Sequence, residues 1–199
     1  MFTMTPEEFK IVNGILEQEV ILYSERGPRN GWDELDGRDW CCLLRVNPEF
    51  ADHCDWDRLR GGDWSILLQK QPQFADRCQW DRLDGFHWCF LLRKQPQFSE
   101  HCNTDLLTRD DWLYLLQVRP EFAECCDVFQ FDHSELCMLL REQPALVYEI
   151  DRTCLDGADW VSVLLRQPQL ADECDWSKLS PADFDKLLTE HPEFADRRP

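Results

Sequence analysis

Residues 56–79 read WDRLRGGDWSILLQKQPQFADRCQ, and residues 80–103 repeat this stretch almost letter for letter as WDRLDGFHWCFLLRKQPQFSEHCN. Prolines then recur every 24 residues from Pro48 to Pro192 without a slip. A fixed period of this length is typical of solenoids, in which each unit buries its apolar face only against its neighbours. The seven predicted units are 32–55, 56–79, 80–103, 104–127, 128–151, 152–175 and 176–199.

Each unit is predicted to contain one α-helix and one shorter helix, either α or 3-10. Ser180, Pro181 and Asp183 show the helix start most clearly, with a capping side chain, a proline at the first helical position and an acid that closes the capping box. The recurrent proline, such as Pro72, ends that helix and begins the shorter one. The sequence therefore predicts an all-α helical repeat solenoid.

Residues 1–31 do not fit the repeat. The capping box TPEE at 5–8 predicts a helix start, and Gly27-Pro28 predicts its end. We expect an N-terminal capping helix that covers the first apolar face of the array at 32–199. Binding to a membrane surface is the alternative, but the acids on the polar face of this helix would be repelled by anionic lipids.

The composition limits the partners and the compartment. A net charge of −18 argues against direct binding to nucleic acid and favours a partner protein with a basic surface. The sequence contains no apolar run of about 18 residues, so it predicts no transmembrane helix. The N-terminus has acids where a signal peptide needs basic residues, so we do not expect secretion by that route. Five of the 11 cysteines recur at one repeat position: Cys54, Cys78, Cys102, Cys126 and Cys174. Successive repeats lie about 8–10 Å apart, too far for disulfides, so we expect free thiols and a cytoplasmic location.

The repeat pattern W-x-x-L-x-G-x-D-W-x-x-L-L-x-x-x-P-x-F-A-x-x-C covers 32–199 and resembles tandem arrays of bacterial proteins. Its alternation of α and 3-10 segments is architecturally similar to the bacterial leucine-rich repeat variant proteins, whose core residues are smaller than the Trp, Phe and Cys found here. That family is associated with an iron–sulfur cluster on a separate cysteine-rich segment. This sequence has no such segment, so the resemblance implies no cofactor.

The sequence shows no pattern that points to catalysis or to a metal. Cys41-Cys42 and Cys125-Cys126 are adjacent pairs rather than zinc-type C-x-x-C motifs, and the histidines mostly occupy different repeat positions. There is no nucleophile elbow and no phosphate-binding loop. Because helix caps explain the paired carboxylates, we expect no catalytic residue, no metal site and no cofactor.

Acidic residues recur at two repeat positions outside the caps. Solvation of the surface is the simpler interpretation of these acid columns, and contact with a basic partner is the other. The first acid column is Asp52, Asp76, Glu100, Glu124, Asp172 and Asp196. The second acid column is Asp57, Asp81 and Asp105.

The fifth repeat departs from both columns. Phe129 replaces an acid of the second column, and Tyr148 replaces an acid of the first. Phe86 and Leu165 also stand where other repeats have small or polar residues. Exposed aromatic side chains often anchor interfaces, so these four residues are candidate partner contacts. Alternatively, repeat five has degenerated and its aromatic side chains have repacked inward.

The sequence favours a non-enzymatic scaffold that binds another protein, with contacts near repeats four to six. The alternative is an acidic nucleic-acid mimic, of the kind that a phage or a mobile element encodes. Such an inhibitor would occupy the basic groove of a nucleic-acid-binding protein.

Overall fold

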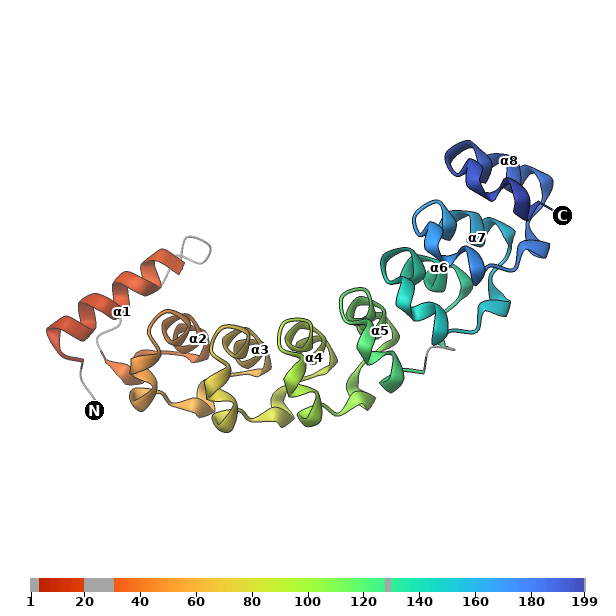
Figure 1. The fold of residues 1–199 in the computed structure, drawn as a ribbon. Helices are drawn as coiled ribbons and strands as arrows, with labels where there is room; N and C mark the ends of the chain where they lie inside the picture. Colours follow the sequence, from red (N-terminus) through yellow and green to blue (C-terminus); the bar gives the residue numbers. More distant parts are fainter. Residues whose placement is uncertain (1–3, 20–30, 128–129, 199) are drawn as a thin grey trace. The chain divides into compact units, whose positions relative to one another are not determined.

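The computed structural model describes residues 4–19, 31–127 and 130–198. It shows an all-α chain in which α-helices alternate with 3-10 segments (Figure 1). The chain divides into two compact units, Met1–Leu107 and Thr108–Pro199, here called unit 1 and unit 2. The boundary between them falls inside the fourth repeat.

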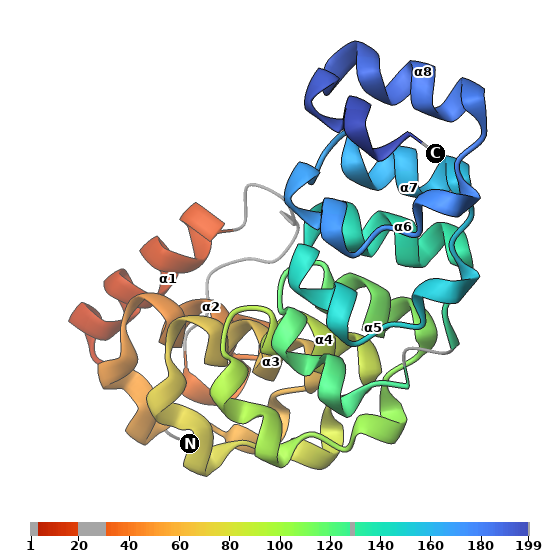
Figure 2. The ribbon, with the colours of Figure 1, turned by 45° about the vertical axis from the view of Figure 1, so that its right-hand side comes forward.

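Unit 1 contains the N-terminal helix and the first three repeats. Its α-helices pack against their neighbours in sequence order, from α1 against α2 to α3 against α4 (Figure 2). Its α-helices are α1 (Pro6–Glu19), α2 (Gly37–Val46), α3 (Gly61–Lys70) and α4 (Gly85–Leu92). Its 3-10 segments are η2 (Trp32–Glu34), η3 (Pro48–His53), η4 (Trp56–Arg58), η5 (Pro72–Arg77), η6 (Trp80–Arg82), η7 (Pro96–His101) and η8 (Thr104–Leu106).

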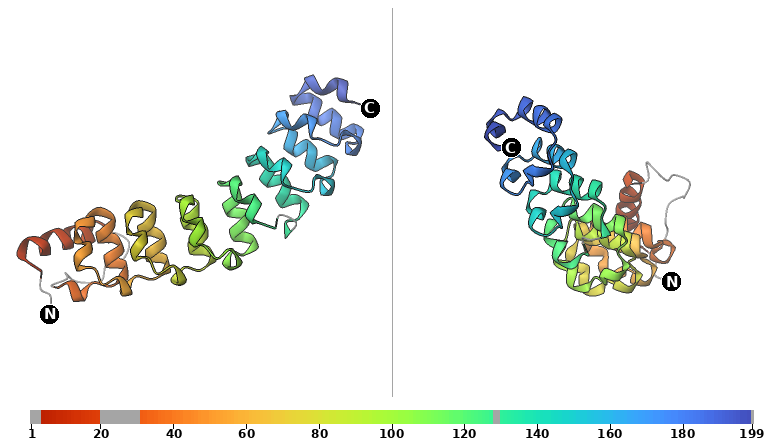
Figure 3. Two further views of the ribbon diagram at one scale, coloured as in Figure 1. Left: turned by 60° about the horizontal axis from the view of Figure 1, so that its bottom comes forward. Right: turned by 90° about the vertical axis from the view of Figure 1, so that its right-hand side faces the viewer.

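Unit 2 repeats the same alternation. Each of its α-helices packs against the next one along the chain (Figure 3). Its α-helices are α5 (Arg109–Leu116), α6 (His133–Glu142), α7 (Gly157–Leu164) and α8 (Pro181–Glu190). Its described 3-10 segments are η9 (Pro120–Cys125), η11 (Pro144–Tyr148), η12 (Arg152–Cys154), η13 (Pro168–Asp172), η14 (Trp176–Lys178) and η15 (Pro192–Arg197).

The α-helices begin at the predicted capping boxes. In α2, the Asp36 carboxylate accepts from the Asp39 backbone N–H at 2.9 Å, and Asp39 accepts in return from the Asp36 N–H at 3.1 Å. In α3 the cap position is Arg60, whose side chain cannot accept, so only the bond from its N–H to Asp63 remains, at 2.9 Å. The N-terminal helix starts at Pro6 as predicted. Its predicted end at Gly27-Pro28 lies outside the described residues.

The segments that begin at the recurrent proline are 3-10 helices, which settles the choice that the sequence left open. With three residues per turn, positions four apart do not share one face. In η5, Phe74 is buried, whereas Cys78, which follows the segment, is only half-buried. The spacing of Phe74 and Cys78 in the sequence predicts that both lie on the buried face of this segment, and the structure buries only Phe74.

Tryptophan forms the centre of the second repeat. Trp64 in α3 is fully buried, and Trp56 stacks on it with ring centroids 5.5 Å apart and an interplanar angle of 11°. Phe74 packs on Trp56 at 5.2 Å in a tilted geometry. One α-helix and its two 3-10 segments thus share a single aromatic cluster, which burial of apolar area stabilises.

Candidate interaction surface

In three places of the described chain, a basic side chain bonds two backbone carbonyls of the preceding repeat. The Arg58 guanidinium donates to the Asp33 and Leu35 carbonyls of the preceding repeat at 2.7 and 2.6 Å. Arg82 donates in the same way to Asp57 and Leu59, both at 2.7 Å. In unit 2, the Lys178 ammonium bonds the Thr153 and Leu155 carbonyls. Charge-assisted bonds of this kind are stronger than neutral ones, so they stabilise the contact between repeats. We call the contacts of Arg58, Arg82 and Lys178 the cation clamp.

Glutamines form a second link along each unit. Gln71 donates from its side-chain amide to the Arg45 carbonyl of the preceding repeat at 3.0 Å. Gln95 bonds Gln69 at 3.0 Å, and Gln143 bonds Gln117 at 2.6 Å. These bonds occupy carbonyls near the ends of the α-helices, where no intrahelical donor is left.

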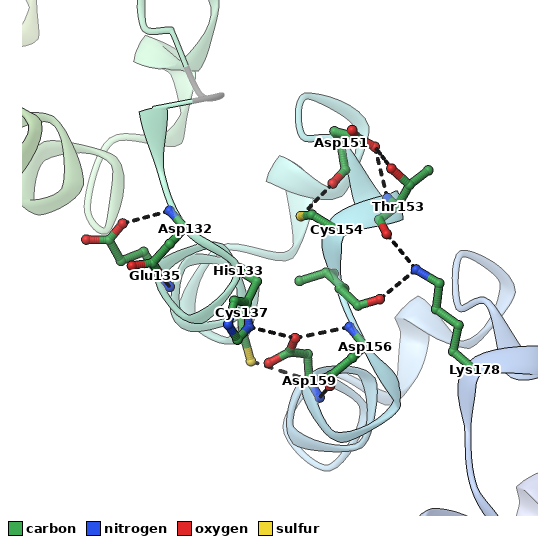
Figure 4. A network of polar contacts seen from close by, with 11 residues as sticks. Asp132, His133, Glu135, Cys137, Asp151, Thr153, Cys154, Asp156, Asp159 and Lys178 are labelled. Carbon is green, nitrogen blue, oxygen red and sulfur yellow. Dashed lines mark hydrogen bonds and ion pairs between the residues drawn. The ribbon is translucent and has the colours of Figure 1, made fainter.

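The capping acids also contact the preceding repeat, as the unit 2 network shows (Figure 4). Asp159 accepts from the Asp156 N–H at 3.1 Å and lies 3.1 Å from Nδ1 of His133, one repeat earlier. Arg109 forms an ion pair with Glu135 in the same way. The carboxylates of these capping pairs therefore take part in hydrogen bonds and ion pairs with the preceding repeat.

The thiols recur at a protected position. All cysteines of the described residues are free. Burial raises the pKa of Cys54, Cys78, Cys102 and Cys174 to about 12. Thiols with so high a pKa stay protonated near neutral pH and are poor nucleophiles and poor metal ligands. Within the described ranges, no three His, Cys, Asp or Glu side chains gather closely enough to hold a metal ion.

The first acid column lies in the 3-10 segments that begin at the recurrent proline. All six of its carboxylates are exposed. In unit 2, Asp172 accepts from Arg197 at 2.6 Å, yet its side chain remains 81% exposed. The six residues are Asp52, Asp76 and Glu100 in unit 1 and Glu124, Asp172 and Asp196 in unit 2.

The second acid column lies in the short 3-10 segments η4, η6 and η8 of unit 1. Asp57, Asp81 and Asp105 are all exposed. Asp57 accepts from the Gln79 side chain at 2.6 Å but keeps 80% of its side chain exposed. Neither column takes part in a capping box, so the acids of both columns are dispensable for the helix starts.

The four aromatic or apolar departures have different surroundings. Tyr148 is 72% exposed, so it has not repacked inward, and Phe86 is 67% exposed. Leu165 is half-buried directly after α7. Phe129 lies outside the described residues. Phe86 belongs to unit 1, whereas Tyr148 and Leu165 belong to unit 2, so the structure does not group them into one patch.

A polar groove lies at the N-terminal ends of α2 and α3. Its volume is about 740 Å³, and Arg38, Arg60 and Asp63 are among the residues that line it. Burial raises the pKa of the Asp63 carboxyl, and the negative charge of Asp36 adds to the effect. A bond from the Arg60 N–H opposes it. The sequence interpretation missed this groove, although Arg60 in place of a capping acid is a visible signal.

Comparison of the chain with protein-family models, with curated proteins and with solved structures finds no match. Among the described residues, no helix has both the length and the apolar character needed to cross a bilayer.

Proposed function

We propose that the chain is a non-enzymatic repeat scaffold that binds a partner protein with a basic surface. The exposed acid columns carry this proposal. Acids in the capping boxes stabilise the helix starts, whereas those of the columns lie outside these boxes. Asp57 and Asp172 also contact the next repeat, but each keeps about four fifths of its side chain exposed, 80% and 81%. Exposed charges of one sign are available to steer and orient a partner of opposite charge.

The first test compares capture of partners from a native lysate by the full chain and by a charge variant. We expect Asp52→Asn/Asp76→Asn/Glu100→Gln to lose the partner that the wild type retains. Binding should also weaken as salt rises, because exposed charges are screened. The matched control Asp110→Asn/Glu142→Gln/Glu190→Gln removes as many acids from the helices. Equal capture by wild type, variant and control would reject the columns as the binding surface.

Tyr148 is the second candidate contact of this function. Because its ring is 72% exposed, Tyr148→Ala should leave the melting temperature unchanged. Loss of an aromatic anchor should weaken binding of the captured partner about tenfold or more. Tyr114→Ala, which removes another exposed ring of unit 2, is the control. An unchanged dissociation constant for Tyr148→Ala would remove this residue from the interface.

The regularity of the first column supports one alternative. Its acids occur in four successive repeats, from Asp52 to Glu124, as charges occur along a nucleic acid. Under this alternative, the captured partner binds DNA or RNA, and the chain competes with that ligand. A partner that binds both at once would contradict the mimic and leave the scaffold proposal intact.

A further inference from the structure

Unit 1 presents a second surface, formed by the solvent side of its helices and the residues that end them. We call it the helix face of unit 1. It consists of the residues at four positions of each of the first three repeats, spaced i, i+4, i+7 and i+8, which share one side of an α-helix. All twelve residues are exposed or half-buried. They are Arg38, Cys42, Arg45 and Val46; Gly62, Ile66, Gln69 and Lys70; and Phe86, Phe90, Arg93 and Lys94.

This face has the opposite charge from the rest of the chain. It carries five bases and no acid, a net charge of +5, on a chain whose net charge is −18. The same four positions of repeats four to seven, all in unit 2, carry three acids and three bases. The repeat itself therefore does not require basic residues there. Those acids are Asp110, Glu142 and Glu190, and the bases are Arg141, Arg166 and Lys186.

The face also carries exposed apolar side chains. The rings of Phe86 and Phe90 stack with centroids 6.3 Å apart and an interplanar angle of 10°. Phe86 is 67% exposed and Phe90 39%, with Ile66 of the neighbouring helix at 40%. Gln69, also on the face, donates to the Phe90 carbonyl at 3.3 Å, which joins α3 to α4 beneath this patch. When a partner covers exposed apolar groups and removes them from water, the free energy of the complex falls.

Two lysines follow these apolar residues by four positions, Lys70 after Ile66 and Lys94 after Phe90. Lys70 ends α3, and Lys94 lies in the turn after α4. Both are exposed, and within the described part of the chain neither has an ion-pair or hydrogen-bond partner from its side chain. Apolar side chains together with charged ones are the usual composition of a protein interface.

We propose that the helix face of unit 1 binds an acidic amphipathic segment of a partner protein. The apolar side chains of that segment cover Phe86, Phe90 and Ile66, and its carboxylates pair with Lys70 and Lys94. This inference goes beyond the proposed function, because it uses a different surface and a partner of opposite charge. In unit 1, the helices and the acidic 3-10 segments lie along different sides of the ribbon (Figure 1).

The composition of the face favours a protein segment over other polyanions. Phe86 and Phe90 offer rings on which a base can stack, but Ile66 and Val46 are aliphatic and suit the apolar side chains of a protein segment. The net charge of −18 repels a long polyanion such as nucleic acid. A second copy of the chain offers carboxylates from its acid columns, but in unit 1 those columns contain no apolar side chain to cover Phe86.

The test is fluorescence anisotropy on the full chain with a labelled amphipathic helical peptide of Glu and Leu, about 18 residues long. A peptide with Lys in place of Glu, and oligothymidylate, are the comparison probes. Lys70→Glu/Lys94→Glu should weaken binding of the acidic peptide about tenfold or more, because two attractions become repulsions. Phe86→Ala should weaken it about tenfold. Arg166→Glu, at the same repeat position in unit 2, should change it by less than about twofold.

Several outcomes would overturn the proposal. The acidic peptide could bind no tighter than the lysine peptide, or bind wild type and Lys70→Glu/Lys94→Glu equally. Oligothymidylate that binds and displaces the acidic peptide would assign the face to nucleic acid. A doubled mass by light scattering, lost in the same double variant, would assign it to a second copy. Circular dichroism checks that each variant folds. A basic partner captured through the acid columns should still bind the double variant, so the two proposals fail separately.

Discussion

At the scale of single residues, glycine decides how closely two repeats approach. A Cβ atom added at Gly61 would lie 2.3 Å from the Arg82 carbonyl oxygen of the next repeat. At Gly37 the corresponding distance, to the Arg58 carbonyl oxygen, is 2.1 Å. Because these carbonyls belong to the backbone, they cannot rotate away. A repeat with a side chain at this position must therefore arrange its junction with the next repeat differently.

Gly61→Ala should destabilise the chain by about 1–3 kcal/mol, the usual cost of overpacking. Gly62→Ala is the matched control, since its added Cβ would meet only the His87 side chain, at 3.3 Å. That substitution also replaces glycine in a helix, so we expect a change within about 1 kcal/mol. Chemical denaturation of both variants measures the difference. Equal loss of stability in the two would contradict the role of the close approach.

At the scale of elements, the sequence predicts the helix starts well and the repeat contacts poorly. The capping box of α2 follows from Asp36 and Asp39, because both partners in that motif are close in sequence. The cation clamp could not be predicted in this way. Its acceptors are backbone carbonyls, and its repeat position holds Glu34, Arg58 or Leu106 in different repeats. A pattern search by residue type therefore finds no motif there.

The candidate site shows the same limit. Tyr148 and Phe86 were identified because each breaks a repeat pattern, and both are exposed. The helix face of unit 1 was missed because its signal is the absence of acids at several positions of an acidic chain. The signal is present in the sequence as the net charge of the four helical positions that share one side of each α-helix, taken over the first three repeats.

The 3-10 segments that begin at the recurrent proline end next to thiols whose pKa is raised to about 12. At pH 8 such a thiol is ionised in about one molecule in ten thousand, against about one in ten for an ordinary pKa near 9. Iodoacetamide should therefore modify exposed Cys125 well before Cys54, Cys78 or Cys102. Peptide mapping by mass spectrometry over time measures this order. Denatured protein should lose the order, and equal native rates would contradict the protection.

At the scale of the whole molecule, each clamp and glutamine bond described above joins one repeat to the adjacent repeat. Arg82 bonds Asp57 and Leu59, and Gln95 bonds Gln69, all within unit 1. Stability in such an array is close to a sum of repeats and junctions, so damage at one junction stays local. Unit 2 follows the same rule, with Lys178 as its clamp.

Arg82→Met should therefore loosen one junction and leave unit 2 unchanged. Loss of two charge-assisted bonds to carbonyls should cost about 1–3 kcal/mol locally. Amide hydrogen exchange should rise around Leu59 and Leu83 but not in α7. Arg77→Met, which alters an exposed arginine of η5, is the control. Faster exchange in unit 2 would show that the clamp acts at long range.

The clamps and the glutamine bonds also determine how the chain responds to tension. Each carries a load from one repeat to the next, and none spans two repeats. Within a unit, a pull on its ends is therefore resisted by junctions in series, of which the weakest opens first. The opened repeat lengthens the chain while the remaining repeats keep their bonds. Each unit should therefore extend in discrete steps, each the length of one opened repeat.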